Sequence, residues 1–191
     1  MRTLLSFLLA FNVFCSVANA QKVKPLFNTI TDVVYRTDSK NNPVIENIVE
    51  VNAKGVVHYR SVWYNGIADT TYQLQDTSIT KLNKFFNGAK PLTGYMLTDK
   101  MNPGHHFAGP LEYVSYTGNG NKTDSFILVA PFVIPALNDV LREINIMPSK
   151  IAYKGKTITN LTLSKQIKIT EARCSYIPKI EEPPEVMELK N

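Results

Sequence analysis

The chain has 191 residues, of which 44% are hydrophobic and 19% are charged, with 9 Gly and 11 Pro. This composition excludes collagenous, coiled-coil, low-complexity and wholly disordered proteins, and the length suits one domain with a proper core. The 2 Cys exclude a small disulfide-stapled scaffold, and a net charge of +5 is too modest to indicate nucleic-acid binding.

The first twenty residues have the three parts of an export signal. Arg2 supplies the positive start, an apolar stretch runs over residues 4–17, and Ala18-Asn19-Ala20 forms a small-x-small cleavage site before Gln21. A membrane anchor is the alternative, but Asn12 interrupts a stretch that is short for a bilayer span. We therefore expect a soluble, exported protein, periplasmic or extracellular after cleavage near Ala20, with no membrane span.

Cleavage changes both the charge and the cysteine content of the chain. It removes Arg2 and no acid, so the net charge falls from +5 to +4. A lipid anchor on Cys15 would require small residues before it, and these are absent. With Cys15 removed, Cys174 stands alone and the mature chain has no internal disulfide. Residues 21–29 are expected to be a lead-in to the first regular element.

That first element is a predicted hairpin over residues 45–63, in which apolar and polar residues alternate along both halves. A three-residue loop after Asn52 keeps the valines of both strands on one face, whereas a loop of two or four residues would place His58 among them. The sequence therefore predicts a bulged hairpin with Gly55 in the left-handed conformation and Glu50 opposite His58 on the polar face.

A short strand is predicted over residues 70–75, followed by a helix over residues 76–87 that Asp76 caps and Gly88 ends. The helix has an apolar stripe at three-and-four spacing. Its members are Ile79, Leu82, Phe85 and Phe86. Residues 90–110 are rich in Gly and Pro, and we expect an irregular connection there.

A second hairpin is predicted from strands at residues 111–117 and 122–130, which turn through residues 118–121. A second amphipathic helix begins at Pro135, where the first helical turn tolerates proline, and ends before Pro148. Its apolar residues are Leu137, Val140, Leu141 and Ile144.

Residues 157–169 alternate apolar and polar side chains, which predicts a strand with Thr159, Leu161, Leu163, Ile167 and Ile169 on its apolar face. A last strand is expected over residues 173–177.

Together these elements predict an α+β fold, a mainly antiparallel sheet with two amphipathic helices packed on it. The expected domain covers residues 21–177, with a weak duplication of residues 30–90 in 111–147 as an open alternative. Residues 178–191 are rich in Pro and Glu and are expected to be a flexible acidic tail.

One loop carries the strongest hint of metal chemistry. His105 and His106 lie in a loop rich in Gly and Pro, with Asp99 before them and Glu112 after them. Histidine nitrogens and carboxylate oxygens bind zinc, but adjacent histidines usually point apart and no helix presents two ligands on one face. A turn-rich loop is the favoured interpretation, and a metal site on these four residues remains the alternative.

Other candidate sites are weaker still. Residues 118–123 lack the glycine and the following helix of a phosphate-binding loop, so we interpret them as a turn. Cys174 is expected to be a small buried side chain rather than a nucleophile. No serine lies in a G-x-S-x-G elbow. Carboxylates are plentiful, but no spacing singles out an acid–base pair. The carboxylates weighed for such a pair are Asp32, Asp38, Glu46 and Glu50.

Residues 150–179 carry a local charge of +6. An anionic partner would suit this segment, but the spread is wide, and lysines also discourage strand-to-strand aggregation. We favour a solvated edge on which the acidic tail could fold back.

Aromatic side chains give a better indication of function. Alternation cannot bury all of the tyrosines and the tryptophan on one face, and Tyr and Trp suit contact surfaces. The residues predicted to contact a partner are Tyr59, Trp63, Tyr64 and Tyr116. Core filling is the alternative for about half of the aromatic residues.

The segment from residue 48 to residue 88 resembles small exported bacterial domains of unknown function. In those domains a strand pair reading Gly-x-Val-x-Tyr precedes a further strand and a short amphipathic helix, and here the matching residues are Gly55-Val56-Val57-His58-Tyr59. The resemblance covers about the first half of the chain. It implies the fold class only and brings no activity or site.

The sequence therefore favours an exported, soluble binding protein over an enzyme, and no cofactor is expected. Its expected partner is another envelope or extracellular protein, with no role for nucleic acid and with the oligomeric state left open. The alternative is a hydrolase or metal-dependent enzyme that uses the loop of His105 and His106. A ligand-holding β-barrel is disfavoured because two helices interrupt the strands.

Overall fold

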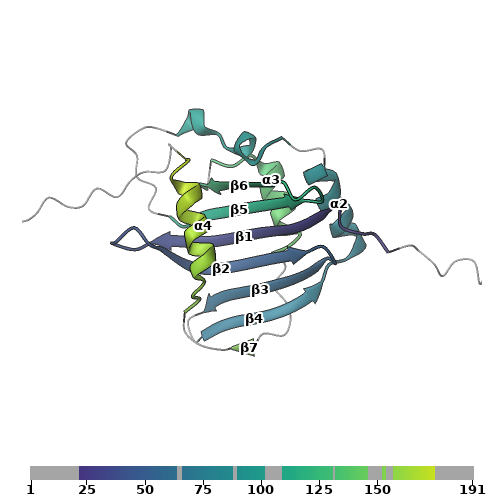
Figure 1. Cartoon of the computed structure of the whole chain (residues 1–191), viewed down its shortest axis with the longest axis horizontal. Helices are drawn as coiled ribbons and strands as arrows, with labels where there is room; N and C mark the ends of the chain where they lie inside the picture. The colour runs from purple at the N-terminus through teal and green to yellow at the C-terminus, as the bar shows by residue number, and fades with distance from the viewer. Residues whose placement is uncertain are drawn as a thin grey trace, which may run out of the picture.

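The computed structural model describes residues 22–63, 66–87, 90–101, 109–130, 132–145, 152–153 and 157–174. In this part of the chain, one antiparallel sheet of seven strands is flanked by three α-helices (Figure 1), which confirms the α+β class. The strand order across the sheet is β6-β5-β1-β2-β3-β4-β7. The strands are β1 (Phe27–Thr37), β2 (Pro43–Asn52), β3 (Val56–Trp63), β4 (Gly66–Gln73), β5 (Leu111–Gly118), β6 (Thr123–Leu128) and β7 (Ala152–Tyr153).

Helices cover both faces of this sheet. The helices are α2 (Asp76–Asn87), α3 (Pro135–Arg142) and α4 (Leu161–Glu171), with short 3-10 turns η2 (Leu92–Tyr95) and η3 (Thr98–Lys100). α4 crosses one face, and α3 lies on the other (Figure 1). The Tyr72 hydroxyl of β4 donates to the Ile144 carbonyl just after α3, and the Tyr35 hydroxyl of β1 donates to Glu171 of α4. Below, the two faces are called the α3 face and the α4 face.

The first predicted hairpin is confirmed in its register. Val51 pairs with Val57 and Glu50 with His58. The Gly55 amide donates to the Asn52 carbonyl at 2.9 Å, and Gly55 has a φ of 72°. A side chain with a Cβ is strained at this φ, which explains the glycine. The prediction for the next strand needs correction. The strand expected over residues 70–75 is β4, which begins at Gly66 and ends at Gln73.

The sequence prediction is wrong at β1, which begins inside the expected lead-in and lies in the middle of the sheet. β1 pairs with β2 on one side and with β5 on the other. Ile30 and Asp32 are buried toward one face, and Val33 and Tyr35 toward the other. Because both faces of this strand are covered, it lacks the apolar–polar alternation on which the prediction relied.

The strand predicted over residues 157–169 is also wrong, because most of this segment forms α4. The Asn160 side chain accepts a hydrogen bond from the Leu163 amide at 3.0 Å and caps the helix. Leu163 and Ile167 are buried, whereas Leu161 is 82% exposed. The strand expected over residues 173–177 is described only at residues 173 and 174. These residues form a turn, since the amide of Arg173 donates to the Thr170 carbonyl.

β7 was not predicted from the sequence, whereas α2, the second hairpin and α3 agree with the sequence prediction. α2 spans the predicted residues and buries Ile79, Leu82 and Phe86, while β5 and β6 form the second hairpin. α3 begins at Pro135 as expected and buries Leu137 and Leu141. None of the helices in the described part of the chain combines the length and the apolar character that a bilayer crossing needs.

Candidate functional site

The residues predicted to contact a partner lie in different environments. Tyr59 is 8% exposed, so its assignment to a contact surface is wrong and it belongs to the core. Tyr116 is half-buried and stacks on Phe86, with ring centroids 4.7 Å apart. Trp63 is 37% exposed near the end of β3. Tyr64 lies outside the described residues.

The residues of the alternative metal site are mostly outside the described part of the chain. This holds for His105 and His106, and for the side chain of Asp99. Glu112 is described and lies on β5, on the α3 face. Within the described ranges, no three His, Cys, Asp or Glu side chains gather in a way that could hold a metal ion.

The third histidine, His58, has a partner that the sequence analysis did not predict. It lies opposite Glu50 as expected, but its Nε2 is 2.9 Å from Oδ1 of Asp69 on β4. Nε of Arg60 is 3.1 Å from the other oxygen of Asp69. These side chains are about one-third to one-half exposed on the α4 face.

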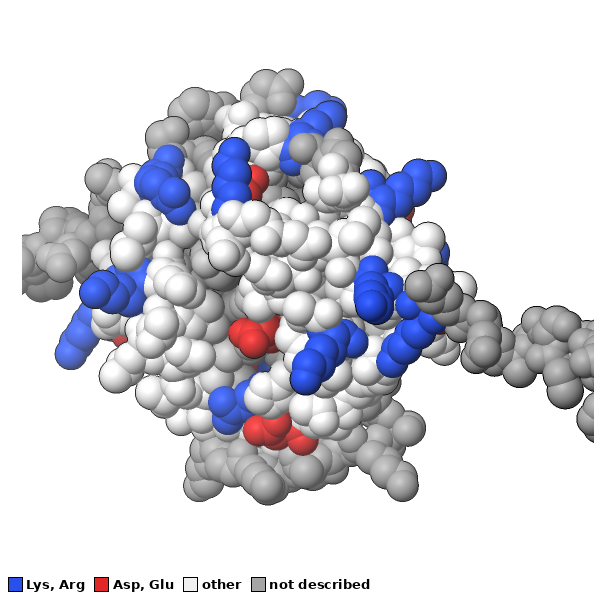
Figure 2. Space-filling model, turned by 45° about the vertical axis from the view of Figure 1, so that its right-hand side comes forward, with Lys and Arg blue, Asp and Glu red and all other residues white. Residues whose placement is uncertain are grey.

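Two further predictions concern the C-terminal half. Cys174 is free and 5% exposed, as expected for a small buried side chain. Lys168 donates to Asn42, and Arg173 donates to Ser125, so these two cations of the predicted basic segment have polar partners. On the face seen in Figure 2, Lys and Arg are scattered rather than gathered in one patch.

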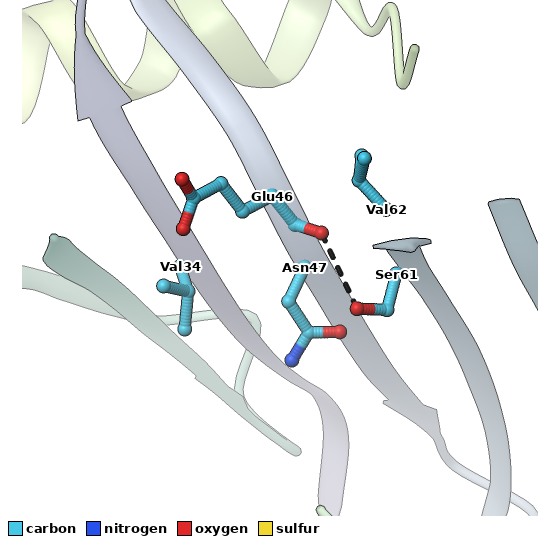
Figure 3. A pocket seen from close by; sticks show the side chains of 5 residues that line it. All are labelled: Val34, Glu46, Asn47, Ser61 and Val62. Atoms are coloured by element: carbon cyan, nitrogen blue, oxygen red, sulfur yellow. Dashed lines mark hydrogen bonds between the residues drawn. The ribbon is translucent and has the colours of Figure 1, made fainter. Parts of the chain in front are cut away.

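An open hollow lies where β1, β2 and β3 meet at one end of the sheet. It measures about 390 Å³ and is lined by Val34, Glu46, Asn47, Ser61 and Val62 (Figure 3). The register explains its position, because Val34 pairs with Asn47 and Asn47 with Ser61, so three neighbouring strands contribute. Glu46 is an extra residue on β2 at this point, since Tyr35 pairs with Ile45. Such a bulge bends the strand and turns side chains toward a site.

The walls of the hollow are partly polar. The Ser61 hydroxyl donates to the Glu46 carbonyl at 3.4 Å, and the Glu46 carboxylate forms an ion pair with Arg36 at 2.6 Å. The Asn47 carboxamide lies between Val34 and Ser61, with its oxygen on the side of Ser61 (Figure 3). This oxygen is buried and has no hydrogen-bond partner among the described residues.

Two exposed apolar side chains lie on the strands that line the hollow. Trp63 lies two residues beyond Ser61 and therefore on the same face. Val44 pairs with Arg36, two residues beyond Val34, and is 50% exposed. We call the hollow together with Val44 and Trp63 the sheet-end surface.

A pair of acids, the buried Asp32 and the half-buried Glu112, lies next to this surface. Val34 of β1 pairs with Glu112 of β5, so Asp32 is a diagonal neighbour of Glu112 on the α3 face. The two carboxyl groups are hydrogen-bonded to each other. Asp32 is 0% exposed, and its Oδ2 accepts a hydrogen bond from Nδ2 of Asn145 at 2.5 Å.

Burial determines the protonation of this pair. The pKa of Glu112 is raised to about 9, chiefly by burial, and the charge of Asp32 and the hydrogen bond to it contribute to the same rise. Burial also raises the pKa of Asp32, while hydrogen bonds from Glu112 and Asn145 act in the opposite direction. Two adjacent carboxylates that are shielded from water cannot both ionise readily. At neutral pH Glu112 therefore stays protonated, and its hydroxyl donates a hydrogen bond to Asp32. This proton also accounts for Oδ1 of Asp32, which has no other donor in the described part of the chain.

Sequence reasoning considered Asp32 and Glu112 separately and missed the pair. Their contact depends on the β1–β5 register, which cannot be read without β1. The available signal was an aspartate in the middle of an apolar segment, because a buried acid needs a partner.

Comparisons with models of protein families, with curated proteins and with solved structures found no match to this chain.

Proposed function

We propose that this chain is an exported, non-catalytic binding protein that holds another envelope or extracellular protein on its sheet-end surface. Export rests on the leader of residues 1–20. Binding rests on one observation above all: Trp63 and Val44 are exposed beside an open hollow with an unpaired buried acceptor, the Asn47 carboxamide oxygen. Tryptophan is enriched among the residues that dominate protein interfaces.

Other exposed apolar residues make weaker candidates. Leu161 and Ile169 on α4 are 82% and 54% exposed. Single exposed apolar side chains are normal on soluble proteins. The sheet-end surface differs because apolar side chains, a hollow and hydrogen-bonding groups lie together there.

Site-directed photo-cross-linking in the producing cells tests this function. A photoreactive phenylalanine analogue replaces Trp63, and a matched chain carries it at Asn119, an exposed residue in the turn between β5 and β6. We expect a discrete protein adduct in the envelope or extracellular fraction from position 63 and none from position 119. Equal adducts from both positions, or none from position 63, would contradict the proposal.

A second function, acid–base catalysis, is favoured by one observation. Glu112 keeps its proton to about pH 9 beside Asp32, and paired carboxyl groups with separated pKa values act as acid and base in hydrolases. The burial of Asp32 argues against it, because this side chain is 0% exposed and cannot touch a substrate in this conformation. Hydrolysis of model ester, peptide or glycoside substrates that is lost in Glu112→Gln would favour this function over binding.

A further inference from the structure

A continuous row of polar side chains connects the buried acid pair with the hollow. Glu112 is hydrogen-bonded to Asp32, and Asp32 accepts from Nδ2 of Asn145 at 2.5 Å. Oδ1 of Asn145 in turn faces Nδ2 of Asn47 at 3.5 Å. Asn47 lines the hollow. The row therefore runs from β5 through β1 and the end of α3 to the wall of the hollow.

The row is one of the attachments of the end of α3 to the sheet, beside the hydrogen bond from Tyr72 to the Ile144 carbonyl. Asn145 follows α3, and its Nδ2 also contacts the Leu141 carbonyl at 3.3 Å. Asp32 thus holds Asn145 against the sheet at a position where Asn47 can reach it. Val34 adds a second connection, because it pairs with both Glu112 and Asn47 and lines the hollow.

No cation compensates the pair within the described residues. On β1 and β2, Arg36 is paired with Glu46, and between α2 and the end of α3, Lys81 is paired with Glu143. On β6, Leu128 lies directly opposite Glu112. β3 contributes the neutral Ser61 opposite Asn47.

The charged groups of β6 and α3 have other partners. Asp124 of β6 accepts from the Leu92 amide, and on α3, Asp139 and Arg142 pair in solvent. Asp32 is the one charged group that acts on Glu112 in the described part of the chain. Loss of the shared proton therefore places two negative charges side by side with nothing positive to offset them.

We propose that Asp32 and Glu112 are positioning residues for the hollow, and that the proton they share keeps Asn145, and through it Asn47, in place at the hollow's wall. This inference adds regulation by pH to the proposed binding site, and it rests on the proposed function for the role of the hollow. When the proton leaves, repulsion between the carboxylates separates Asp32 from Glu112 and displaces Asn145. The binding surface then changes shape while the rest of the sheet stays folded.

The chain carries its own reporter for this change. Its single tryptophan is Trp63, which lies on the sheet-end surface. The experiment follows the fluorescence emission of Trp63 in the full mature chain from about pH 6 to pH 10, with far-UV circular dichroism at every point. Three variants are compared with the wild type: Glu112→Gln, Asn47→Ala and Glu50→Gln.

Each variant isolates one step. Glu112→Gln replaces the protonated acid with a neutral amide that still donates to Asp32, and it retains every tyrosine, so tyrosine ionisation contributes equally to both profiles. Asn47→Ala removes the contact with Asn145 and leaves the acid pair intact. Glu50→Gln removes an exposed carboxylate on the other face and is the matched control.

We expect a one-proton change in Trp63 emission centred near pH 9 in the wild type and in Glu50→Gln, with constant circular dichroism. This change near pH 9 is absent in Glu112→Gln and in Asn47→Ala. The same profile in the wild type and in Glu112→Gln would overturn the inference, and so would loss of all secondary structure together with the emission change. A chain that shows the transition but gives no cross-linked partner would refute the proposed function and leave this inference standing.

Discussion

Replacement of Glu112 by glutamine is expected to stabilise the protein progressively as the pH rises. In the folded chain the pKa of Glu112 is raised from 4.5 to about 9, so folding at neutral pH requires the uptake of a proton. Between these two values the folded state binds more protons than the unfolded state, and the free energy of unfolding falls by about 1.4 kcal/mol for each pH unit. The glutamine variant lacks this term, because its side chain does not titrate.

Urea unfolding of both proteins at about pH 6 and about pH 8 measures this effect. The quantity of interest is the change, between the two pH values, in the stability difference between Glu112→Gln and the wild type. The free energy of unfolding of Glu112→Gln, relative to the wild type, should rise by about 2–3 kcal/mol between the two conditions, with unchanged slopes against urea. Any fixed cost of the amide cancels in this comparison. An equal pH dependence in both proteins would show that Glu112 titrates normally, and the reasoning on the buried pair would then be refuted.

Three other predictions concern the turn, α4 and the leader. Gly55→Ala should cost about 1–2 kcal/mol in thermal or urea unfolding, because Gly55 has a φ of 72° and a Cβ there would meet Ile79 at 3.0 Å; an unchanged stability would contradict the turn geometry. Ile167→Ala should cost about 2–4 kcal/mol, whereas Ile169→Ala, at a 54% exposed position, should cost under about 0.5 kcal/mol; equal losses would favour the rejected strand. Mass spectrometry of the protein from the envelope or medium should show Gln21 as the first residue, and an intact leader would contradict export.

Local patterns predicted much of the fold. The first hairpin could be read to the level of its register, because a one-residue change would place His58 among buried valines. α2 and α3 could be predicted from apolar spacing and from Pro135. These elements owe their structure to short-range features, so a single sequence suffices to find them.

The failures arise where tertiary packing decides the structure. Residues 157–169 fit a strand pattern, yet Leu163 and Ile167 are also four residues apart, which suits one face of a helix. The capping side chain of Asn160 was the signal that could have decided between them. β1 was missed because a strand covered on both faces has no alternation.

The candidate site was predicted only in part. Trp63 is exposed, as a contact residue must be, whereas Tyr59 is buried. The hollow depends on the pairing of three strands and on the extra residue Glu46 in β2, and the acid pair depends on the β1–β5 register. None of these features is visible before the strands are paired.

The central claim, that the sheet-end surface binds a partner, is tested most directly by the affinity of the cross-linked partner for two purified variants. The double variant Val44→Ser/Trp63→Ser alters the sheet-end surface, and Leu161→Ser alters an exposed apolar residue on α4. The account predicts that the double variant binds at least about tenfold more weakly than the wild type, while Leu161→Ser binds equally well. Unchanged affinity of the double variant, with both proteins folded, would contradict it.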